Sequence, residues 1–406
     1  MYVKLAVRNI FRNKRRTFIA GSAIGIGLAA LIWTDALIIG METNMLASAT
    51  ESFLGDGQIH QESFRQSFAV EKTIVNSAEL VRRLAEEEVV AHFSPRAVSF
   101  AMISSPANVS SVTMVGIDPT SERHLSQIDE AIIDGEYFGG DNVRDVIIGS
   151  KLAEILEVDM GDRIVLTVAQ AHSGDLSQEM FRVSGIYHFN AQEMDRGMAF
   201  VRLNVAQKML GLGDDFHEIA LSFRNHELGR DKTDPFWQRY SQDGNEAVGW
   251  AVLLPELELA FEYSQFTTFF VGLILFGVVA LGIINTLFMS LHERMFEFGV
   301  LRAVGTRAFG MARLILLEAA ALSVLSIVFG SLLGFAITFA TAQLGIDYTG
   351  IEFSGVTFRE LLYPELKIAQ FVIYPLSVFV FTVLVGLYPA TFAARMSPAK
   401  AMRRTL

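Results

Sequence analysis

The chain has 406 residues, of which 51% are hydrophobic and 19% are charged, and its formal net charge is -11. Soluble domains carry about 25% charged residues, so a mean hydropathy of +0.37 indicates segments that lie outside water. The sequence has no cysteine, which excludes disulfides, thiolate metal sites and a cysteine nucleophile. The negative charge argues against a nucleic-acid-binding protein.

The first 16 residues are basic and predict an amphipathic helix on the cytoplasmic membrane surface. The segment contains no acid, and its basic residues are Lys4, Arg8, Arg12, Lys14, Arg15 and Arg16. The apolar run that follows is much longer than a signal-peptide core of about 7–15 residues. We therefore predict an uncleaved membrane anchor.

Four long apolar runs each reach the roughly 20 residues that a bilayer-crossing helix needs. Pro375 and Pro389 interrupt the fourth run, which a transmembrane helix tolerates when neighbouring groups satisfy the freed carbonyls. The sequence therefore predicts an α-helical membrane protein. Its predicted transmembrane helices lie at 17–41, 266–291, 314–346 and 368–394.

Basic residues give the orientation, because cytoplasmic loops of membrane proteins carry an excess of Lys and Arg. The segments 1–16, 292–313 and 395–406 are the basic ones, whereas 42–265 has 17 Lys and Arg against 36 Asp and Glu. We therefore predict that both termini and segment 292–313 are cytoplasmic. Segment 42–265 and the short loop 347–367 are predicted to lie outside.

The exported segment 42–265 is long enough for its own core and predicts an α+β domain between the first two membrane helices. One predicted helix begins at a capping box, Asn76 to Glu79, and another begins after Ser150. A further helix is predicted at 204–210, and the predicted strands lie at 97–104, 111–117, 145–148, 164–169, 182–187 and 218–223. The polar segment 225–247 predicts an exposed connection, and a helix from Glu256 continues into the second membrane helix.

Motifs of catalysis are absent from the sequence. There is no G-x-x-x-x-G-K-[ST] phosphate loop, no G-x-S-x-G elbow and no His pair at zinc-binding spacing. We therefore expect a non-catalytic chain without a cofactor or metal site. Asp35 and Glu318 are ionisable residues in or near the membrane runs, which makes them functional candidates. The simpler interpretation is that each reaches water or a neighbouring arginine at the membrane surface.

The segment between the second and third membrane runs is the most informative. Phe296, Val300 and Ala303 recur at helical spacing among charged residues, which predicts a short amphipathic helix parallel to the membrane. Gly305 is a residue typical of a helix C-terminus. Such a helix is suited to docking in a groove of a cytoplasmic partner.

Several motifs carry a resemblance to a known family. Residues 285–305 read N-x-x-x-M-S-x-x-E-R-x-x-E-x-G-x-L-R-A-x-G, and Glu318-Ala319 follow in the next helix. The N-terminal stretch 5–17, the stretch 148–153 with Gly161-Asp162, and Tyr388-Pro389-Ala390 with Ser397-Pro398 agree with the same pattern. The chain resembles the MacB/LolC/LolE/FtsX group of ABC transporter permeases over nearly its whole length.

The resemblance implies a multi-pass protein of the bacterial inner membrane that transmits motion to a periplasmic domain. It implies a dimer with a second copy or a paralogue, bound to two separate ATPase subunits that hold ATP and Mg. It also implies a periplasmic acceptor or adaptor. The residues that it assigns to ATPase coupling are Glu293, Arg294, Glu297, Gly299, Arg302 and Gly305.

The family leaves the substrate open. Release of a lipoprotein or other amphiphile from the membrane is the first hypothesis, because the membrane helices carry few charges that could line a polar pore. MacB-like export of drugs or peptides and FtsX-like regulation of a cell-wall hydrolase are the alternatives. For the first hypothesis we predict that Trp33, Ile38, Phe266 and Phe270 form an acyl-chain site at the dimer interface; alternatively, these residues face membrane lipid.

Overall fold

The computed structural model describes residues 5–6, 8–9, 12, 14–140, 142–189, 191–353, 356–358 and 361–395. The chain folds as two compact units. The helical unit comprises residues 1–42, 261–347 and 361–406, and the α/β unit comprises residues 43–260 and 348–360. The described residues among the first 16 are helical, while the rest of that predicted basic helix and most of the predicted tail 395–406 lie outside the described residues.

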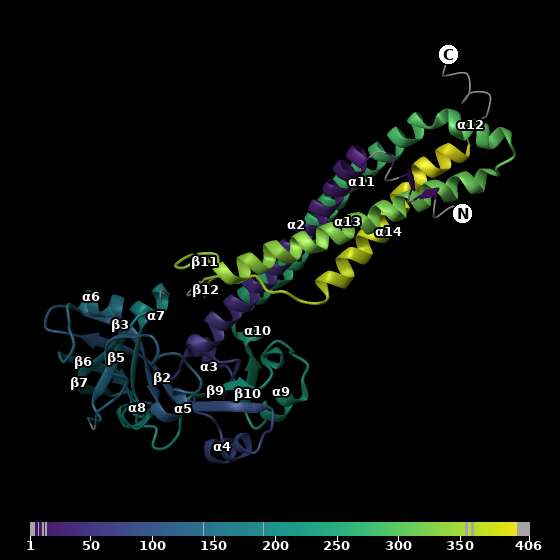
Figure 1. The fold of residues 1–406 in the computed structure, drawn as a ribbon. Coiled ribbons are helices and arrows are strands. Elements are labelled where there is room, and N and C mark those ends of the chain that lie inside the picture. Colours follow the sequence, from purple (N-terminus) through teal and green to yellow (C-terminus); the bar gives the residue numbers. More distant parts are fainter. Residues whose placement is uncertain are drawn as a thin grey trace. The chain divides into compact units, whose positions relative to one another are not determined.

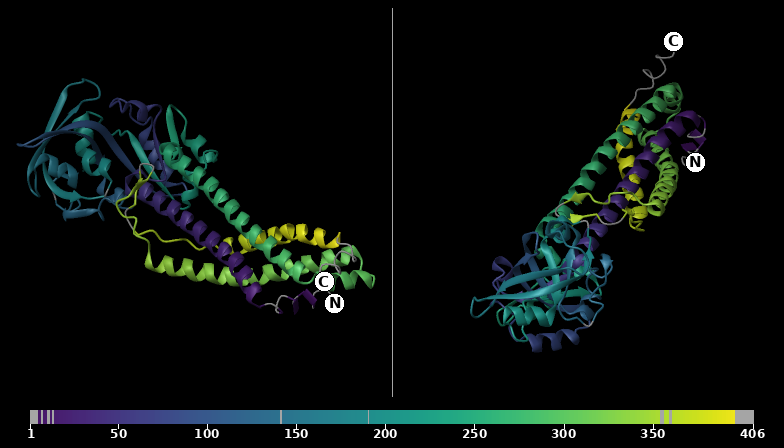
Figure 2. Two further views of the ribbon diagram at one scale, coloured as in Figure 1. Left: turned by 90° about the horizontal axis from the view of Figure 1, so that it is seen from above. Right: turned by 90° about the vertical axis from the view of Figure 1, so that its left-hand side faces the viewer.

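Four long helices run side by side in the helical unit (Figures 1 and 2). They are α2 (Lys14–Ala49), α11 (Pro255–Glu293), α13 (Ala308–Leu344) and α14 (Gln370–Ala394). Each is long and apolar enough to cross a membrane, and each overlaps one of the predicted runs over most of its length. The short helix α12 (Met295–Ala303) connects α11 to α13. The helix α14 continues through Pro375 and Pro389.

Glycines allow α2 and α13 to touch along their backbones. A β-carbon added to Gly330 would lie 2.6 Å from the carbonyl oxygen of Gly25. One turn further along each helix, a β-carbon on Gly334 would lie 3.2 Å from the α-carbon of Ala29. Small residues at four-residue spacing permit such close crossings in membranes, where dispersion rather than the hydrophobic effect joins the helices. The crossing therefore fixes α2 against α13.

The α/β unit is built on a large mixed sheet. Its strands are β1 (Gly57–Gln61), β2 (Val90–Ser104), β3 (Val109–Ile117), β4 (Ile132–Gly135), β5 (Asp145–Gly149), β6 (Arg163–Ala169), β7 (Leu176–Tyr187), β8 (Met198–Arg202), β9 (Glu218–Phe223) and β10 (Asn245–Gly249). The pairing from β2 through β3, β8, β5, β7 and β6 returns to β2, so these six strands close a ring. The strands β9, β1 and β10 extend the sheet from the other edge of β2.

Helices cover the sheet where its strands carry apolar side chains. They are α3 (Phe64–Ser67), α4 (Ser77–Ala85), α5 (Pro119–Glu122), α6 (Ser150–Leu156), α7 (Gln192–Gly197), α8 (Leu203–Leu210), α9 (Pro235–Tyr240) and α10 (Trp250–Leu253). A π-helical turn (Thr50–Leu54) follows α2, a 3-10 turn (His226–Gly229) follows β9, and β11 (Glu352–Phe353) pairs with β12 (Val356–Thr357). The largest core joins ring residues such as Ile103 and Phe181 to Leu152 of α6 and Met209 of α8. Burial of this alternating apolar face holds the ring together.

A buried ion cluster joins three parts of the α/β unit. The Arg96 guanidinium of β2 donates to both oxygens of Glu122, at 2.5 and 3.1 Å, and to Glu218 at 3.3 Å. The Arg96 and Glu122 side chains are fully buried, and the Phe53 ring lies 3.9 Å from the guanidinium carbon. A buried charge is tolerated when it is paired and fully hydrogen-bonded, and this arginine satisfies that condition.

The helix that contains the first predicted membrane run continues past residue 41, because α2 reaches Ala49 and the π-helical turn reaches Leu54. Two expectations for the exported segment are wrong. Segment 225–247 is not an exposed connection, because α9 buries Phe236 and Trp237 and β10 pairs with β1. Asn76 does not close a capping box, since it has a φ of 56° and makes no side-chain cap.

Candidate functional site: the anchored helix α12

The helix α12 is separated from both of its neighbours by sharp breaks. The helix α11 ends at Glu293, Arg294 leaves the helical conformation, and α12 begins at Met295. At the other end, the Gly305 amide donates to the Arg302 carbonyl and the Thr306 amide to the Leu301 carbonyl. This pair of bonds is a Schellman motif, which needs a left-handed residue at the position of Gly305. Gly305 has a φ of 104°, so the predicted helix end is confirmed.

A charged contact holds the start of α12 on α13. The Arg294 Nη1 atom lies 2.7 Å from the Glu318 Oε1 atom, and the Asn9 Nδ2 atom donates to the same oxygen at 2.6 Å. The side chains of Arg294 and Glu318 are only 10% and 7% exposed. Glu318 therefore pairs with a neighbouring arginine, as the simpler interpretation expected.

Glu297 extends this contact to the N-terminal segment. Its two oxygens lie 2.9 Å from Arg294 Nε and 2.9 Å from Arg12 Nη1. The hydrogen bond from Arg294, followed by that from Arg12, lowers the pKa of the Glu297 carboxyl. We call these five residues, Asn9, Arg12, Arg294, Glu297 and Glu318, the charged anchor. It joins three segments that are distant in the sequence, and no single-segment pattern could have revealed it.

The two sides of α12 differ in exposure. Phe298 and Gly299 are buried, and Phe298 packs with Met311 and Ile315 of α13. On the other side, Phe296 is 51% exposed and Val304 is 83% exposed. The helix therefore presents an apolar surface that the described part of the chain leaves open.

Exposure also divides the residues assigned to ATPase coupling. Gly299 and Arg294 are buried within the helical unit, and Arg294 contacts Glu318 of α13. Whether the six residues couple this chain to an ATPase stays a prediction. Glu297 is 44% exposed on its side chain, and Arg302 is half-buried.

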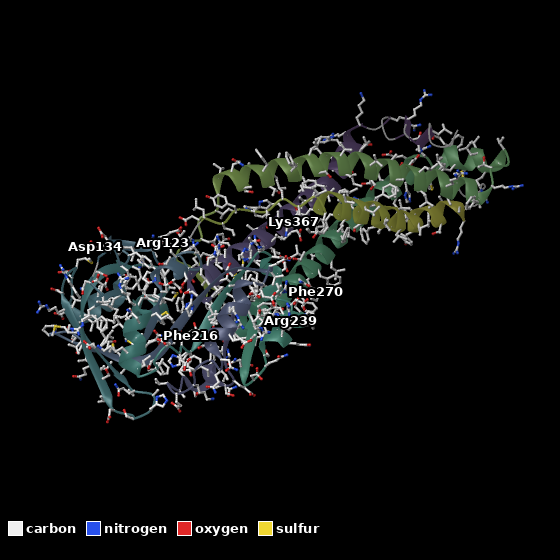
Figure 3. All side chains as sticks on the ribbon, turned by 90° about the horizontal axis from the view of Figure 1, so that it is seen from below. Arg123, Asp134, Phe216, Arg239, Phe270 and Lys367 are labelled. Carbon is white, nitrogen blue, oxygen red and sulfur yellow. The ribbon has the colours of Figure 1, made fainter. Side chains whose placement is uncertain are left out.

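The four residues predicted to form an acyl-chain site, near the end of the bundle opposite α12, also differ in exposure. Trp33 Nε1 donates to Thr341 Oγ1 at 3.3 Å, and Ile38 is half-buried. On α11, Phe266 is 62% exposed and Phe270, which Figure 3 labels, is 58% exposed. Whether the four residues hold acyl chains stays a prediction.

Asp35, the second ionisable candidate, binds α14. Its carboxylate accepts from the Tyr374 hydroxyl at 2.7 Å and from Gln370 Nε2 at 2.9 Å. Buried or partly buried carboxylates in membrane helices are stabilised by such partners. The interaction joins α2 to α14 in the part of the bundle remote from α12.

One Ser–His–Asp grouping occurs in the α/β unit without the geometry of a catalytic triad. Ser150 Oγ lies 2.9 Å from His188 Nδ1, and Asp195 Oδ2 lies 2.8 Å from the same nitrogen. A proton relay needs the serine and the carboxylate on opposite ring nitrogens. The grouping therefore ties the start of α6 to the residue that follows β7 and to α7. Among the described residues there is no cluster of three His, Asp or Glu that could hold a metal ion.

Two family models match the chain. The model for the MacB-like periplasmic core domain matches residues 17–228, which is more than half of the sequence. The model for the FtsX-like permease C-terminal region matches residues 269–398. The chain belongs to the MacB/FtsX-like permease family. The resemblance read from residues 285–305 is confirmed.

Relatives that match nearly the whole chain agree with this assignment. The lipoprotein-releasing system transmembrane protein LolC of Xylella fastidiosa is 23% identical over 99% of this chain and 98% of its own length. LolE of Haemophilus influenzae is 23% identical over 94% and 93%. The periplasmic region of MacB from Actinobacillus actinomycetemcomitans covers 50% of this chain and 92% of its own at 11% identity, with a TM-score of 0.34.

The extracellular domain of YknZ from Gram-positive bacteria covers 48% of this chain and 98% of its own, at 14% identity and a TM-score of 0.33. Membership of the MacB/FtsX-like permease family makes this chain an ABC transporter permease of the inner membrane. Its fold is that of the family, with four membrane helices and a large α/β domain between the first two. A permease of this kind works with an ABC ATPase.

Proposed function

We propose that this permease uses ATPase-driven movement of α12 to release a lipoprotein, or a similar amphiphile, from the inner membrane. The observation that carries the proposal is the charged anchor. It ties the helix that faces a cytoplasmic partner to the N-terminal segment and to α13 through bonds of 2.6–2.9 Å. A push on α12 would therefore reach α2 and α13 together.

The remaining parts of the mechanism are proposed on the same basis. ATP and Mg bind to the partner ATPase, and this chain carries no catalytic residue of its own. The open apolar side of α12, with Phe296, Val300 and Val304, docks in the ATPase. Both termini and α12 lie in the cytoplasm, and the permease pairs with a second copy or a paralogue. The α/β unit passes the released molecule to a periplasmic acceptor.

The lipoprotein substrate is supported by relatives that match nearly the whole chain. The relatives in question are named for lipoprotein release and cover 94–99% of this sequence. The second candidate is MacB-like export of drugs or peptides, which the match to the MacB-like periplasmic core domain favours. Neither candidate needs a charged pore through the membrane helices.

The test of the substrate is depletion of the protein followed by fractionation of the membranes. We expect lipoproteins of the outer membrane to accumulate in the inner membrane. Unchanged lipoprotein sorting with increased sensitivity to exported drugs or peptides would assign the MacB-like function. Unchanged sorting with altered cell-wall cleavage would assign an FtsX-like regulatory function and refute release.

The test of the anchor uses a charge reversal. Glu297→Arg places like charges next to Arg12 and Arg294, so release should fall at least tenfold while the ATPase still hydrolyses ATP. Asp214→Arg makes the same reversal at an exposed turn of the α/β unit and should leave release unchanged. Equal release by the Glu297→Arg variant and the unmodified chain would contradict the role of the anchor.

A further inference from the structure

An apolar groove lies between α2 and α13, on the side of the glycine crossing where α2 begins. Its volume is about 720 Å³. Phe18 and Gly21 of α2 form one wall, and Leu325 and Phe329 of α13 form the other. The side chains of Phe18, Leu325 and Phe329 are 72%, 41% and 42% exposed, so the groove is open to the surroundings of the bundle.

The backbone contact between the helices explains why the groove stays open. The Phe329 ring packs against Gly25, where an added β-carbon would lie 2.6 Å from its Cδ1 atom. At Gly21, one turn earlier, an added β-carbon would meet no backbone atom of α13 within 4 Å, and its nearest neighbour would be Ser326 Oγ at 3.5 Å. The small residues that permit the crossing therefore leave space beside it that no described side chain of the two helices fills.

Two cations stand at one end of this groove. Lys14 and Arg15 line it and are exposed, and no ion pair to either is found within the described part of the chain. They lie on the first turn of α2, about 16 Å along the helix from Gly25. An apolar channel of this length with two cations at its end matches an acyl chain joined to a phosphate.

We propose that this groove binds one anionic phospholipid of the cytoplasmic leaflet. The acyl chain lies between Phe18 and Phe329, and the lipid phosphate accepts hydrogen bonds from Lys14 and Arg15. Each lysine or arginine near an anionic membrane surface is worth about 1 kcal/mol, which is about fivefold in affinity. This lipid site is separate from the proposed acyl-chain site of the transported substrate, because the two sites share no residue.

The consequence concerns the charged anchor. Arg12, which bonds Glu297 of α12, precedes Lys14 by two residues. A lipid held by Lys14 and Arg15 would fix the start of α2 and thereby the position of Arg12. The bound phospholipid would then stabilise the anchored position of α12, so the lipid composition of the membrane would influence coupling.

The test is native mass spectrometry of the delipidated full chain, titrated with phosphatidylglycerol or with phosphatidylcholine of the same acyl chains. We expect one phosphatidylglycerol bound with clear preference over phosphatidylcholine. Lys14→Gln with Arg15→Gln should weaken phosphatidylglycerol binding about 30-fold. Arg307→Gln with Arg395→Gln removes two exposed charges outside the groove and should change binding less than twofold. Ser22→Phe, which fills the groove, should abolish binding of both lipids.

Leu325→Trp fills the groove from α13 and replaces Ser22→Phe if that variant does not fold. Equal affinity for the two lipids, or equal loss in the two double variants, would refute a specific anionic site. Retained lipid in both filled variants would show that the groove is not the binding site. Displacement of the lipid by an equal concentration of inorganic phosphate would show a phosphate site without an acyl-chain component and would overturn the proposal.

Discussion

Replacing Arg294 by Met should destabilise the helical unit by about 3 kcal/mol. The substitution keeps the apolar stem but leaves the Glu318 carboxylate, 7% exposed, without its cationic partner. Removing one member of a buried pair costs about 3–5 kcal/mol. The lower end applies here, because Asn9 still donates to the Glu318 carboxylate at 2.6 Å.

A double variant separates the charge from the packing. Arg294→Met with Glu318→Gln removes both charges, and the amide still accepts from Asn9. Replacing both members of a buried ion pair is often neutral, so we expect stability within about 1 kcal/mol of the unmodified chain. Together with the loss of about 3 kcal/mol for Arg294→Met, this gives an interaction energy of at least about 2 kcal/mol between the two positions, and Glu318→Gln alone completes the cycle.

The assay is unfolding of the full chain in mixed micelles with increasing dodecyl sulfate, followed by circular dichroism of the helices. Arg302→Met is the matched control, because it removes an arginine from α12, the helix that follows Arg294, at a half-buried position with no ion pair among the described residues. A loss for Arg294→Met no larger than for Arg302→Met would refute the reasoning. So would a double variant that is less stable than Arg294→Met alone.

Three further predictions test the packing, the buried histidine and the orientation. Gly330→Ala should lower the stability by about 1–3 kcal/mol in the same unfolding assay, because the added β-carbon would lie 2.6 Å from the carbonyl oxygen of Gly25. Gly282→Ala is the control and should be neutral, because an added β-carbon there would have nothing within 4 Å. Burial lowers the pKa of His217 below its ordinary 6.5, so as the pH falls this histidine becomes protonated in the unfolded chain before it does in the folded chain. The stability of the α/β unit, measured by tryptophan fluorescence in urea, should therefore be full above pH 6.5 and fall as the pH drops below it. In the natural cysteine-free background, Gln242→Cys should react with an impermeant maleimide on intact spheroplasts, and Val304→Cys only after lysis.

Each of these expectations has a contrary result. Equal stability of Gly330→Ala and Gly282→Ala would show that the helices do not touch at their backbones. If the dependence of stability on pH were unchanged in His217→Gln but lost in His172→Gln, an exposed position, it would belong to a group other than His217. Labelling of Val304→Cys in intact spheroplasts would reverse the proposed topology.

The features that the sequence predicts well are those coded within one segment. The four membrane helices follow from the length of the apolar runs, and the strand at 218–223 follows from a short apolar stretch between turn residues. The end of α12 follows from Gly305, because glycine adopts the left-handed conformation without steric cost. These signals need no knowledge of the partner segment.

Features that depend on distant partners were missed. The strand at 57–61 is short and polar, and it is fixed by pairing with β9 and β10, more than 150 residues later. The helix at 235–240 lies in a polar stretch, but Trp237 packs so closely against β1 that a β-carbon on Gly57 would lie 2.6 Å from its ring. The bond between Arg12 and Glu297 spans 285 residues. Such elements are determined by tertiary packing, which the propensity of the local sequence does not reflect.

Helix α12 is proposed to pass ATP-driven motion to the rest of the permease through the charged anchor. The most direct measurement is ATP-dependent release of a fluorescent lipoprotein from proteoliposomes that contain the permease and its ATPase. The unmodified chain should release the lipoprotein only with ATP. Glu297→Arg should keep ATP hydrolysis within twofold and lose at least tenfold in release. Release without ATP, or release by Glu297→Arg at the unmodified rate, would contradict the account.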